Sequence, residues 1–174
     1  NGARGQEAFE LAIRDARNSP TPTKIALSLS SDFVANQERA FITKLLPDVD
    51  LLIANSSESM AFCQVDSAHA AFSALKLLCP NVVTTQGKDG ALFYINNVEG
   101  DIKSYPSRMV DTTGAGDAFA GGLIFGLVNG YAPDQSIRFG NFLASKVIEQ
   151  FGARLGEDAF NLWQEEFGHL RPGK

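Results

Sequence analysis

The stretch Asp111-Thr112-Thr113-Gly114-Ala115-Gly116-Asp117-Ala118-Phe119 joins a glycine-rich turn to an acidic residue at the start of an apolar segment. Gly114 and Gly116 have no Cβ, so a phosphate can approach the main chain and accept hydrogen bonds from successive N–H groups. Residues 118–128 predict a helix, whose N-terminal partial positive charge stabilises an anion over the turn and keeps Asp117 ionised. An ionised aspartate there can accept the proton of a hydroxyl that attacks a terminal phosphate. The stretch therefore predicts phosphoryl transfer.

Together with Gly121 and Gly122, this stretch resembles the C-terminal signature of the PfkB (ribokinase-like) carbohydrate and nucleoside kinases. Residues 55–58, Asn-Ser-Ser-Glu, resemble the Asn-x-x-Glu motif of that family, and residues 85–90, Thr-Gln-Gly-Lys-Asp-Gly, resemble its Thr-x-Gly-x-x-Gly nucleotide loop. The similarity covers residues 7–167 and implies the second half of such a kinase, after the region that holds most sugar-binding residues and the lid.

The resemblance implies a role for individual residues of this chain. Asp117 is the expected base, and the expected anion hole is formed by Gly114, Ala115 and Gly116. The expected neighbours of ATP are Asn55, Thr85, Gly87, Gly90, Gly116, Asn141 and Ala144. Glu58 is expected to contact Mg²⁺ through water. A monovalent cation such as K⁺ is expected near oxygens of Asp111, Thr113, Val147, Gln150 and Gly152.

Several of these residues also have purely structural interpretations. Asn55 and Glu58 have the spacing of a helix capping box, which is compatible with the family role. Residues 87–90 fit a tight hairpin turn in which Asp89 and Gly90 supply positive φ values. Core packing is the alternative for Ala144. Because no Gly-Lys-Ser/Thr sequence is present, Lys88 is not assigned the catalytic role of a P-loop lysine.

Composition limits the classes of partner. Fifteen Lys and Arg against twenty Asp and Glu give a net charge of −5 with no basic cluster, which argues against nucleic-acid and anionic-membrane surfaces. No apolar run reaches the roughly 18 residues that a membrane helix needs. Cys63 and Cys79 lack metal-ligand spacing and are expected to be reduced thiols, which suits the cytoplasm. His69 and His169 are expected to be solvated, and Phe160, Trp163 and Phe167 to form a core-facing stripe.

The hydrophobic pattern alternates between strands and helices over residues 1–174, which we interpret as one lobe. Strands are expected at residues 25–29, 50–54, 82–85, 91–95 and 102–105. Helices are expected at residues 6–17, 37–46, 67–78, 116–129, 134–150 and 157–167. This order predicts a three-layer α/β fold, with a mainly parallel sheet covered by helices on both faces.

In such sheets ligands bind beyond the carboxyl ends of the strands, and Asn55, Thr85 and the Gly114 turn each follow a predicted strand. Three motifs are therefore expected at one rim. The expected reaction is transfer of the ATP γ-phosphoryl group to a hydroxymethyl group of a sugar or nucleoside, with adenosine-kinase-like or fructokinase-like members resembled most. A vitamin kinase fits the signature less well. The alternative is a catalytically silent nucleotide-binding lobe that needs the other half or associates with itself through the uncovered edge of strand 25–29.

Overall fold

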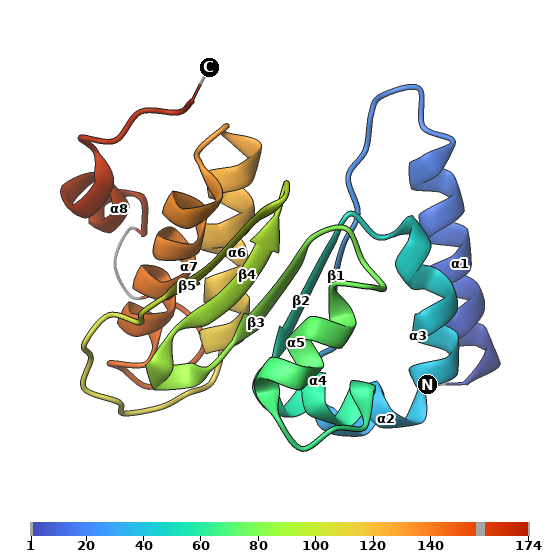
Figure 1. Cartoon of the computed structure of the whole chain (residues 1–174). Helices are drawn as coiled ribbons and strands as arrows, with labels where there is room; N and C mark the ends of the chain where they lie inside the picture. Colours follow the sequence, from blue (N-terminus) through green and yellow to red (C-terminus); the bar gives the residue numbers. More distant parts are fainter. Residues whose placement is uncertain (1, 156–158, 174) are drawn as a thin grey trace. The chain divides into compact units, whose positions relative to one another are not determined.

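The computed structural model describes residues 2–155 and 159–173. Its five strands form one sheet in the order β1-β2-β3-β4-β5 (Figure 1). The contacts divide the chain into two compact units. Unit 1 comprises Asn1–Thr85 and Tyr94–Asn96, and unit 2 comprises Gln86–Phe93 and Asn97–Lys174. The single lobe interpreted from the sequence remains a prediction.

Unit 1 contains three parallel strands, β1 (Ala26–Ser28), β2 (Leu51–Asn55) and β3 (Val82–Thr85). The first four residues of β2 and the first three of β3 are buried, as expected for parallel strands covered by helices. The helices of this unit are α1 (Ala3–Arg17), α2 (Asp32–Gln37), α3 (Arg39–Leu45), the 3₁₀ turn η1 (Leu46–Asp48), α4 (Ser56–Cys63) and α5 (Ala68–Leu75). Helices α4 and α5 pack against β3. The parallel register places Asn55 beside Thr85 at the carboxyl end of their strands.

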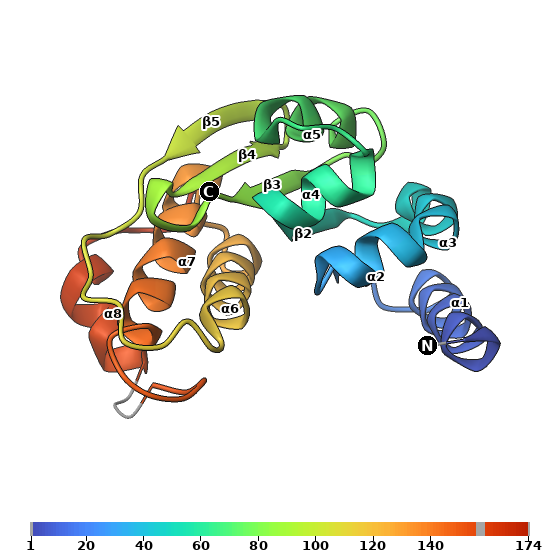
Figure 2. The same cartoon turned by 90° about the horizontal axis from the view of Figure 1, so that it is seen from below.

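Unit 2 is built around two long helices that lie side by side, α6 (Ala115–Val128) and α7 (Pro133–Val147) (Figures 1 and 2). The other elements are η2 (Gly87–Asp89), β5 (Val98–Ile102) and α8 (Ala159–Phe167). The residues of β4 (Ala91–Ile95) are divided, with 91–93 in unit 2 and 94–95 in unit 1. An aromatic cluster of Phe139, Phe142, Trp163 and Phe167 joins α7 to α8. Within the described residues, no helix combines the length and apolar character needed to cross a membrane.

The mainly parallel α/β alternation is confirmed, and three predicted elements need correction. The helix expected at 37–46 is α3, which begins at Arg39, and a further helix, α2, ends just before it because the chain leaves helical geometry at Glu38. The strand expected at 102–105 lies earlier, at β5, whose exposed Glu and Asp residues and central glycine hide it from a hydrophobic pattern. In the Gly87–Asp89 turn, positive φ occurs at Gly87 and Gly90 and not at Asp89.

One prediction for the C-terminal helix needs correction. The stripe on α8 is buried at Trp163 and Phe167, whereas Phe160 is 56% exposed and stacks on the outside of Trp163. The predicted helix began at Glu157, which lies outside the described residues. Cys63 and Cys79 are both free, and His69 and His169 are exposed, as expected.

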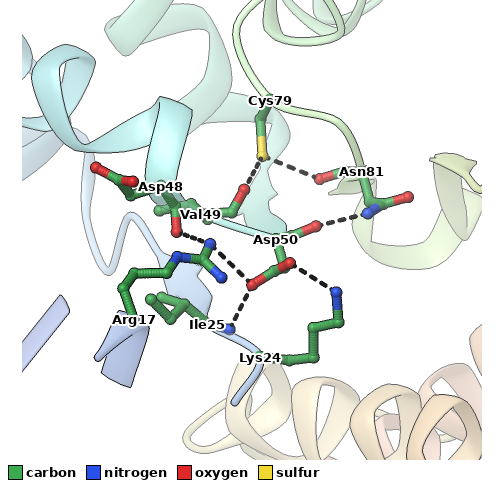
Figure 3. Close-up of polar contacts among 8 residues, drawn as sticks. All are labelled: Arg17, Lys24, Ile25, Asp48, Val49, Asp50, Cys79 and Asn81. Carbon is green, nitrogen blue, oxygen red and sulfur yellow. Dashed lines mark hydrogen bonds and ion pairs between the residues drawn. The ribbon is translucent and has the colours of Figure 1, made fainter. Parts of the chain in front are cut away.

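A charged network around Asp50 fastens the N-terminal part of unit 1 to β2 (Figure 3). The Asp50 carboxylate accepts a hydrogen bond from the Ile25 N–H at 2.9 Å and lies 3.0 Å from both Arg17 and Lys24. The Asn81 amide donates to the Asp50 carbonyl at 2.6 Å. Burial raises the pKa of Asp50, but the Ile25 N–H and the two cations outweigh burial, so the pKa is lower than usual. The carboxylate form is thus favoured by the fold.

Substitution of Asp50 by asparagine is expected to lower the free energy of unfolding at neutral pH by roughly 1–3 kcal/mol, because charge-assisted hydrogen bonds are lost. Since folding lowers this pKa, the contribution is present above the unfolded pKa of about 3.9 and is lost as pH falls through the folded value. Urea unfolding from neutral to acid pH checks both statements. The matched variant Asp15→Asn, whose exposed partner Arg14 lies at 3.6 Å, should change stability by less than about 0.5 kcal/mol. Equal losses in the two variants would contradict a special role for Asp50.

Candidate active site

The glycine-rich turn begins α6 in the way the sequence suggests. Gly114 is the N-cap of α6 and has φ of 80°, in the left-handed region that favours glycine. A Cβ at Gly114 would lie 2.7 Å from the Cα of Ala153, so the turn also packs directly on the segment that follows α7. Both constraints require glycine here.

The amide groups of this turn are only partly used within the protein. The Ala115 N–H donates to the Thr112 carbonyl at 3.2 Å. Within residues 2–155 and 159–173, the N–H groups of Gly114, Gly116 and Asp117 have no hydrogen-bond acceptor. Such amides at a helix N-terminus can bind an anion. Of the three residues expected to form the anion hole, Gly114 and Gly116 therefore have unused donors.

Asp117 lies in the first turn of α6 and is exposed to solvent. Its carboxylate is not enclosed by hydrocarbon, which would have excluded a catalytic role. It stands beside the unused N–H groups at the N-terminal end of α6. The geometry is thus compatible with a group that accepts a proton from a bound hydroxyl.

Asp111 fastens the turn to the end of α7. Its carboxylate accepts hydrogen bonds from the Thr113 N–H at 2.9 Å, the Thr113 hydroxyl at 2.7 Å and the Gly152 N–H at 3.0 Å. The Gly152 bond, followed by the two Thr113 bonds, lowers the pKa of Asp111. Three residues expected near a monovalent cation therefore lie together.

The other two residues expected at the cation lie along the same segment, where the Gln150 N–H donates to the Val147 carbonyl at 3.4 Å. In the part of the chain that the structure describes, His, Cys, Asp and Glu side chains form no cluster of metal-binding type. A cation held by main-chain oxygens, as the resemblance implies, needs no such cluster.

A cavity of about 530 Å³ in unit 2 adjoins the turn. Thr112 and Ala115 line it at the turn, and Asn141 and Ala144 line it from α7. Gly87 belongs to the same lining. The cavity thus brings together three of the expected site segments: the turn, the nucleotide loop and α7.

Asn141 and Gly90 support the walls of this cavity. Asn141 is 6% exposed, and its amide donates to the carbonyls of Ile102 at 3.3 Å and Lys103 at 3.1 Å. Gly90 is buried with φ of 103°, and a Cβ there would lie 2.0 Å from the Ile102 carbonyl oxygen. Gly90 is not among the lining residues, so its place in the structure is that of a close-packing glycine behind the nucleotide loop.

The lining also includes residues that sequence reasoning missed. They come from the segment after β5 and from the end of α7, and are Ser104, Tyr105, Pro106, Ser107, Met109, Ser145 and Ile148. The segment 104–109 carries no motif and no periodic pattern. Only its position before the glycine-rich turn could have suggested that it borders the same space.

At the end of β2 in unit 1, the capping box expected from Asn55 and Glu58 is present. The Asn55 side chain accepts from the Glu58 N–H at 2.8 Å, and the Glu58 carboxylate accepts from the Asn55 N–H at 2.9 Å. The Ser56 hydroxyl donates to the Thr85 carbonyl at 3.2 Å. Asn55, Glu58 and Thr85 are therefore held at one end of unit 1, and Asn55 is exposed there.

Glu58 is 7% exposed, and burial raises its pKa. Because folding raises this pKa, the contribution of Glu58 to stability is fully present below the unfolded pKa of about 4.3 and is lost as pH rises through the folded value. Glu58→Gln keeps a side-chain acceptor for the cap without a charge to desolvate. We expect the variant to equal or exceed the parent in stability near pH 7, and this advantage to shrink as pH falls toward about 4. Urea unfolding of both proteins across that range measures it, and a difference that does not change with pH would contradict the burial argument.

Comparison with known proteins places this geometry in a family. The model of the pfkB family carbohydrate kinases matches residues 5–159. The chain belongs to this family. The adenosine kinase of Saccharomyces cerevisiae is 31% identical over 139 residues, which cover 72% of this chain and 41% of that enzyme. The pfkB chain therefore spans less than half the length of this curated relative.

Solved structures agree with the family assignment. The adenosine kinase from Sinorhizobium meliloti is 26% identical with a TM-score of 0.86, and the match covers 92% of this chain and 50% of that one. Ribokinase from Thermotoga maritima, at 22% identity and a TM-score of 0.63 over 83% of this chain and 48% of that one, shows the fold alone. The ribokinase-like α/β fold expected from the sequence is thereby confirmed.

Proposed function

We propose that this chain carries the nucleotide side of an ATP-dependent kinase, which transfers the γ-phosphoryl group to a hydroxymethyl group of a sugar or nucleoside. The observation that carries the proposal is the cavity of about 530 Å³ that opens beside the glycine-rich turn. Unused amides of Gly114 and Gly116 are available to a phosphate there, and exposed Asp117 follows them directly. The small-molecule acceptor and a cytoplasmic location are part of the proposal.

Each group has one task in the proposed reaction. The amides of the turn stabilise the negative charge that develops on the transferred group. Asp117 accepts the proton of the attacking hydroxyl. Asn141 and Ala144 lie beside the base and ribose of ATP, and the nucleotide loop at Gly87 lies beside its ribose and phosphates.

The fit of Mg²⁺ depends on Glu58. One carboxylate oxygen of Glu58 accepts the Asn55 N–H, which leaves the second oxygen to accept from a water of a hydrated ion. Mg²⁺ usually keeps several waters, so contact through water suits a single buried carboxylate. When bound, Mg²⁺ neutralises phosphate charge. A monovalent cation near Asp111 and Gly152 is proposed as a further support of the turn.

The second candidate is a lobe that binds the nucleotide without turnover. Its support is the length of the chain, which covers 41% of the yeast adenosine kinase. The groups that select the acceptor in a complete kinase would then come from the missing part or from a second copy.

One assay separates the two candidates. Purified chain is incubated with ATP and Mg²⁺, with adenosine, ribose or fructose as acceptor, and ADP release and ATP binding are both measured. ADP release that depends on one acceptor supports the kinase. ATP binding without ADP release supports the silent lobe, and a folded chain that does not bind ATP contradicts both.

A further inference from the structure

We propose that the ammonium group of Lys88 binds the phosphate chain of the nucleotide and is the electrostatic anchor of this cavity. The inference rests on the proposed function, because it assumes that a nucleotide occupies the space beside the glycine-rich turn. It assigns Lys88 a binding role, not the catalytic role of a P-loop lysine.

Among the residues that the structure describes, Lys88 is the one charged residue in the cavity lining. Its neighbours in that lining are hydroxyl-bearing, amide-bearing, apolar or glycine residues. The acidic neighbour Asp89 is not part of the lining. Within the described residues Lys88 has no ion pair. By contrast, Lys103, whose main chain lies near Gly90 of the same loop, forms an ion pair with Asp101 at 3.0 Å. An unpaired cation is thus available to a ligand.

The main chain at Lys88 is held in place. The Ser104 hydroxyl donates to the Lys88 carbonyl, and the Gln86 N–H donates to the Gly90 carbonyl at 2.7 Å across the base of the loop. The Gly90 N–H donates to the Gly87 carbonyl at 3.1 Å. Because the loop is closed on itself and tied to Ser104, the lysine side chain starts from a fixed point on the cavity wall.

Three other polar side chains of the lining have already used their donors. The Asn141 amide donates to the carbonyls of Ile102 and Lys103, and the Ser145 hydroxyl donates to the Phe142 carbonyl at 2.7 Å. The Ser104 hydroxyl is engaged with Lys88 itself. The hydroxyls of Ser107 and Thr112 remain as neutral donors in the lining, so among its side chains only Lys88 can supply a positive charge to a polyanion.

The charge of the whole chain makes a local cation important. The net charge of −5 repels a negatively charged nucleotide at long range. The attraction that binds the nucleotide must therefore come from direct contacts within the cavity. A lysine contacts phosphate as a mobile point charge, and this contact weakens as salt screens it. The ligand class is consequently a nucleoside di- or triphosphate, and the effect of Lys88 should grow with phosphate number.

The test is isothermal titration of the purified chain with ATP, ADP and adenosine, at roughly 0.01 M and roughly 0.15 M ionic strength. Lys88→Gln should raise the Kd for ATP roughly 5- to 10-fold at low salt, raise that for ADP less, and leave that for adenosine unchanged. Lys88→Arg should stay within about 2-fold of the parent, because the charge is retained. Lys103→Gln removes the same charge outside the cavity lining and is the matched control, expected to change the Kd for ATP by less than about 2-fold.

The outcomes separate this inference from the proposed function. If the parent and Lys88→Gln bind ATP equally well, the anchor role is wrong while the nucleotide cavity stands. The same conclusion follows if the substitution lowers the affinity for ATP and for adenosine by the same factor. If Lys103→Gln weakens ATP as much as Lys88→Gln, the effect is one of net charge and the anchor role is again wrong. A folded parent that binds no ATP overturns the inference together with the proposed function.

Discussion

Replacing Asp117 by asparagine is expected to lower turnover roughly 100-fold or more while ATP binding stays nearly intact. Asparagine has almost the same shape and keeps the first turn of α6, but it cannot accept a proton. The amides of Gly114 and Gly116 do not depend on this side chain, so they should still bind the phosphate groups of ATP before the reaction. The measurement combines ADP release with titration of ATP, on the longest form of the protein that turns over.

The matched control for this substitution is Asp134→Asn. Asp134 is also an exposed aspartate in the first turn of a long helix, α7, and it is outside the cavity lining. It should leave turnover within about 2-fold, since a helix-dipole contact of this kind changes stability by only about 0.3–1 kcal/mol. Turnover that survives Asp117→Asn, or falls equally in both variants, would refute Asp117 as the base.

Alanine at Gly122 is expected to destabilise the protein by roughly 1–3 kcal/mol, because α6 and α7 have no room for a methyl group at their crossing. A Cβ at Gly122 would lie 2.7 Å from the Phe139 carbonyl oxygen, and one at Gly140 would lie 2.7 Å from the Phe119 carbonyl oxygen. Main chain cannot move aside as a flexible side chain can. Urea unfolding, with the slope checked for constancy, gives the change in free energy.

The neighbouring residue Gly121 provides an internal control, because alanine there is expected to raise the stability of the protein instead of lowering it. Gly121 is exposed on the same helix, and a Cβ there would meet nothing within 4 Å. Gly121→Ala should therefore stabilise the protein by roughly 0.5–1 kcal/mol, the ordinary gain of alanine over glycine in a helix. Loss of stability in both variants would show that the close contact at Gly122 is not the cause.

Sequence reasoning found the elements whose signal is local. The capping box at Asn55 and Glu58 was visible because its two partners are three residues apart. The start of α6 was visible because Gly114 and Asp117 stand directly before an apolar run. Buried strands such as β2 were visible as short, continuous apolar runs.

The parts that sequence reasoning missed depend on distant partners. β5 was misplaced because a strand with exposed Glu99 and Asp101 has little hydrophobic pattern of its own. Asp111 and Gly152 were expected together only through the family resemblance, because a hydrogen bond that spans 41 residues leaves no trace in the spacing. Residues 104–109 become part of the cavity wall only in the folded chain, where residues of α7 line the same space. Such features arise from tertiary packing, which a linear pattern does not record.

The close contact of α6 and α7, made possible by Gly122 and Gly140, restricts how the two helices can move. Helices whose main chains are in contact resist sliding and rotation against one another, because either motion would bring main-chain atoms into a clash. The proposed base, Asp117, lies on α6, and the cavity wall around Asn141 lies on α7. The close packing of the two helices therefore opposes a change in the distance between these two groups.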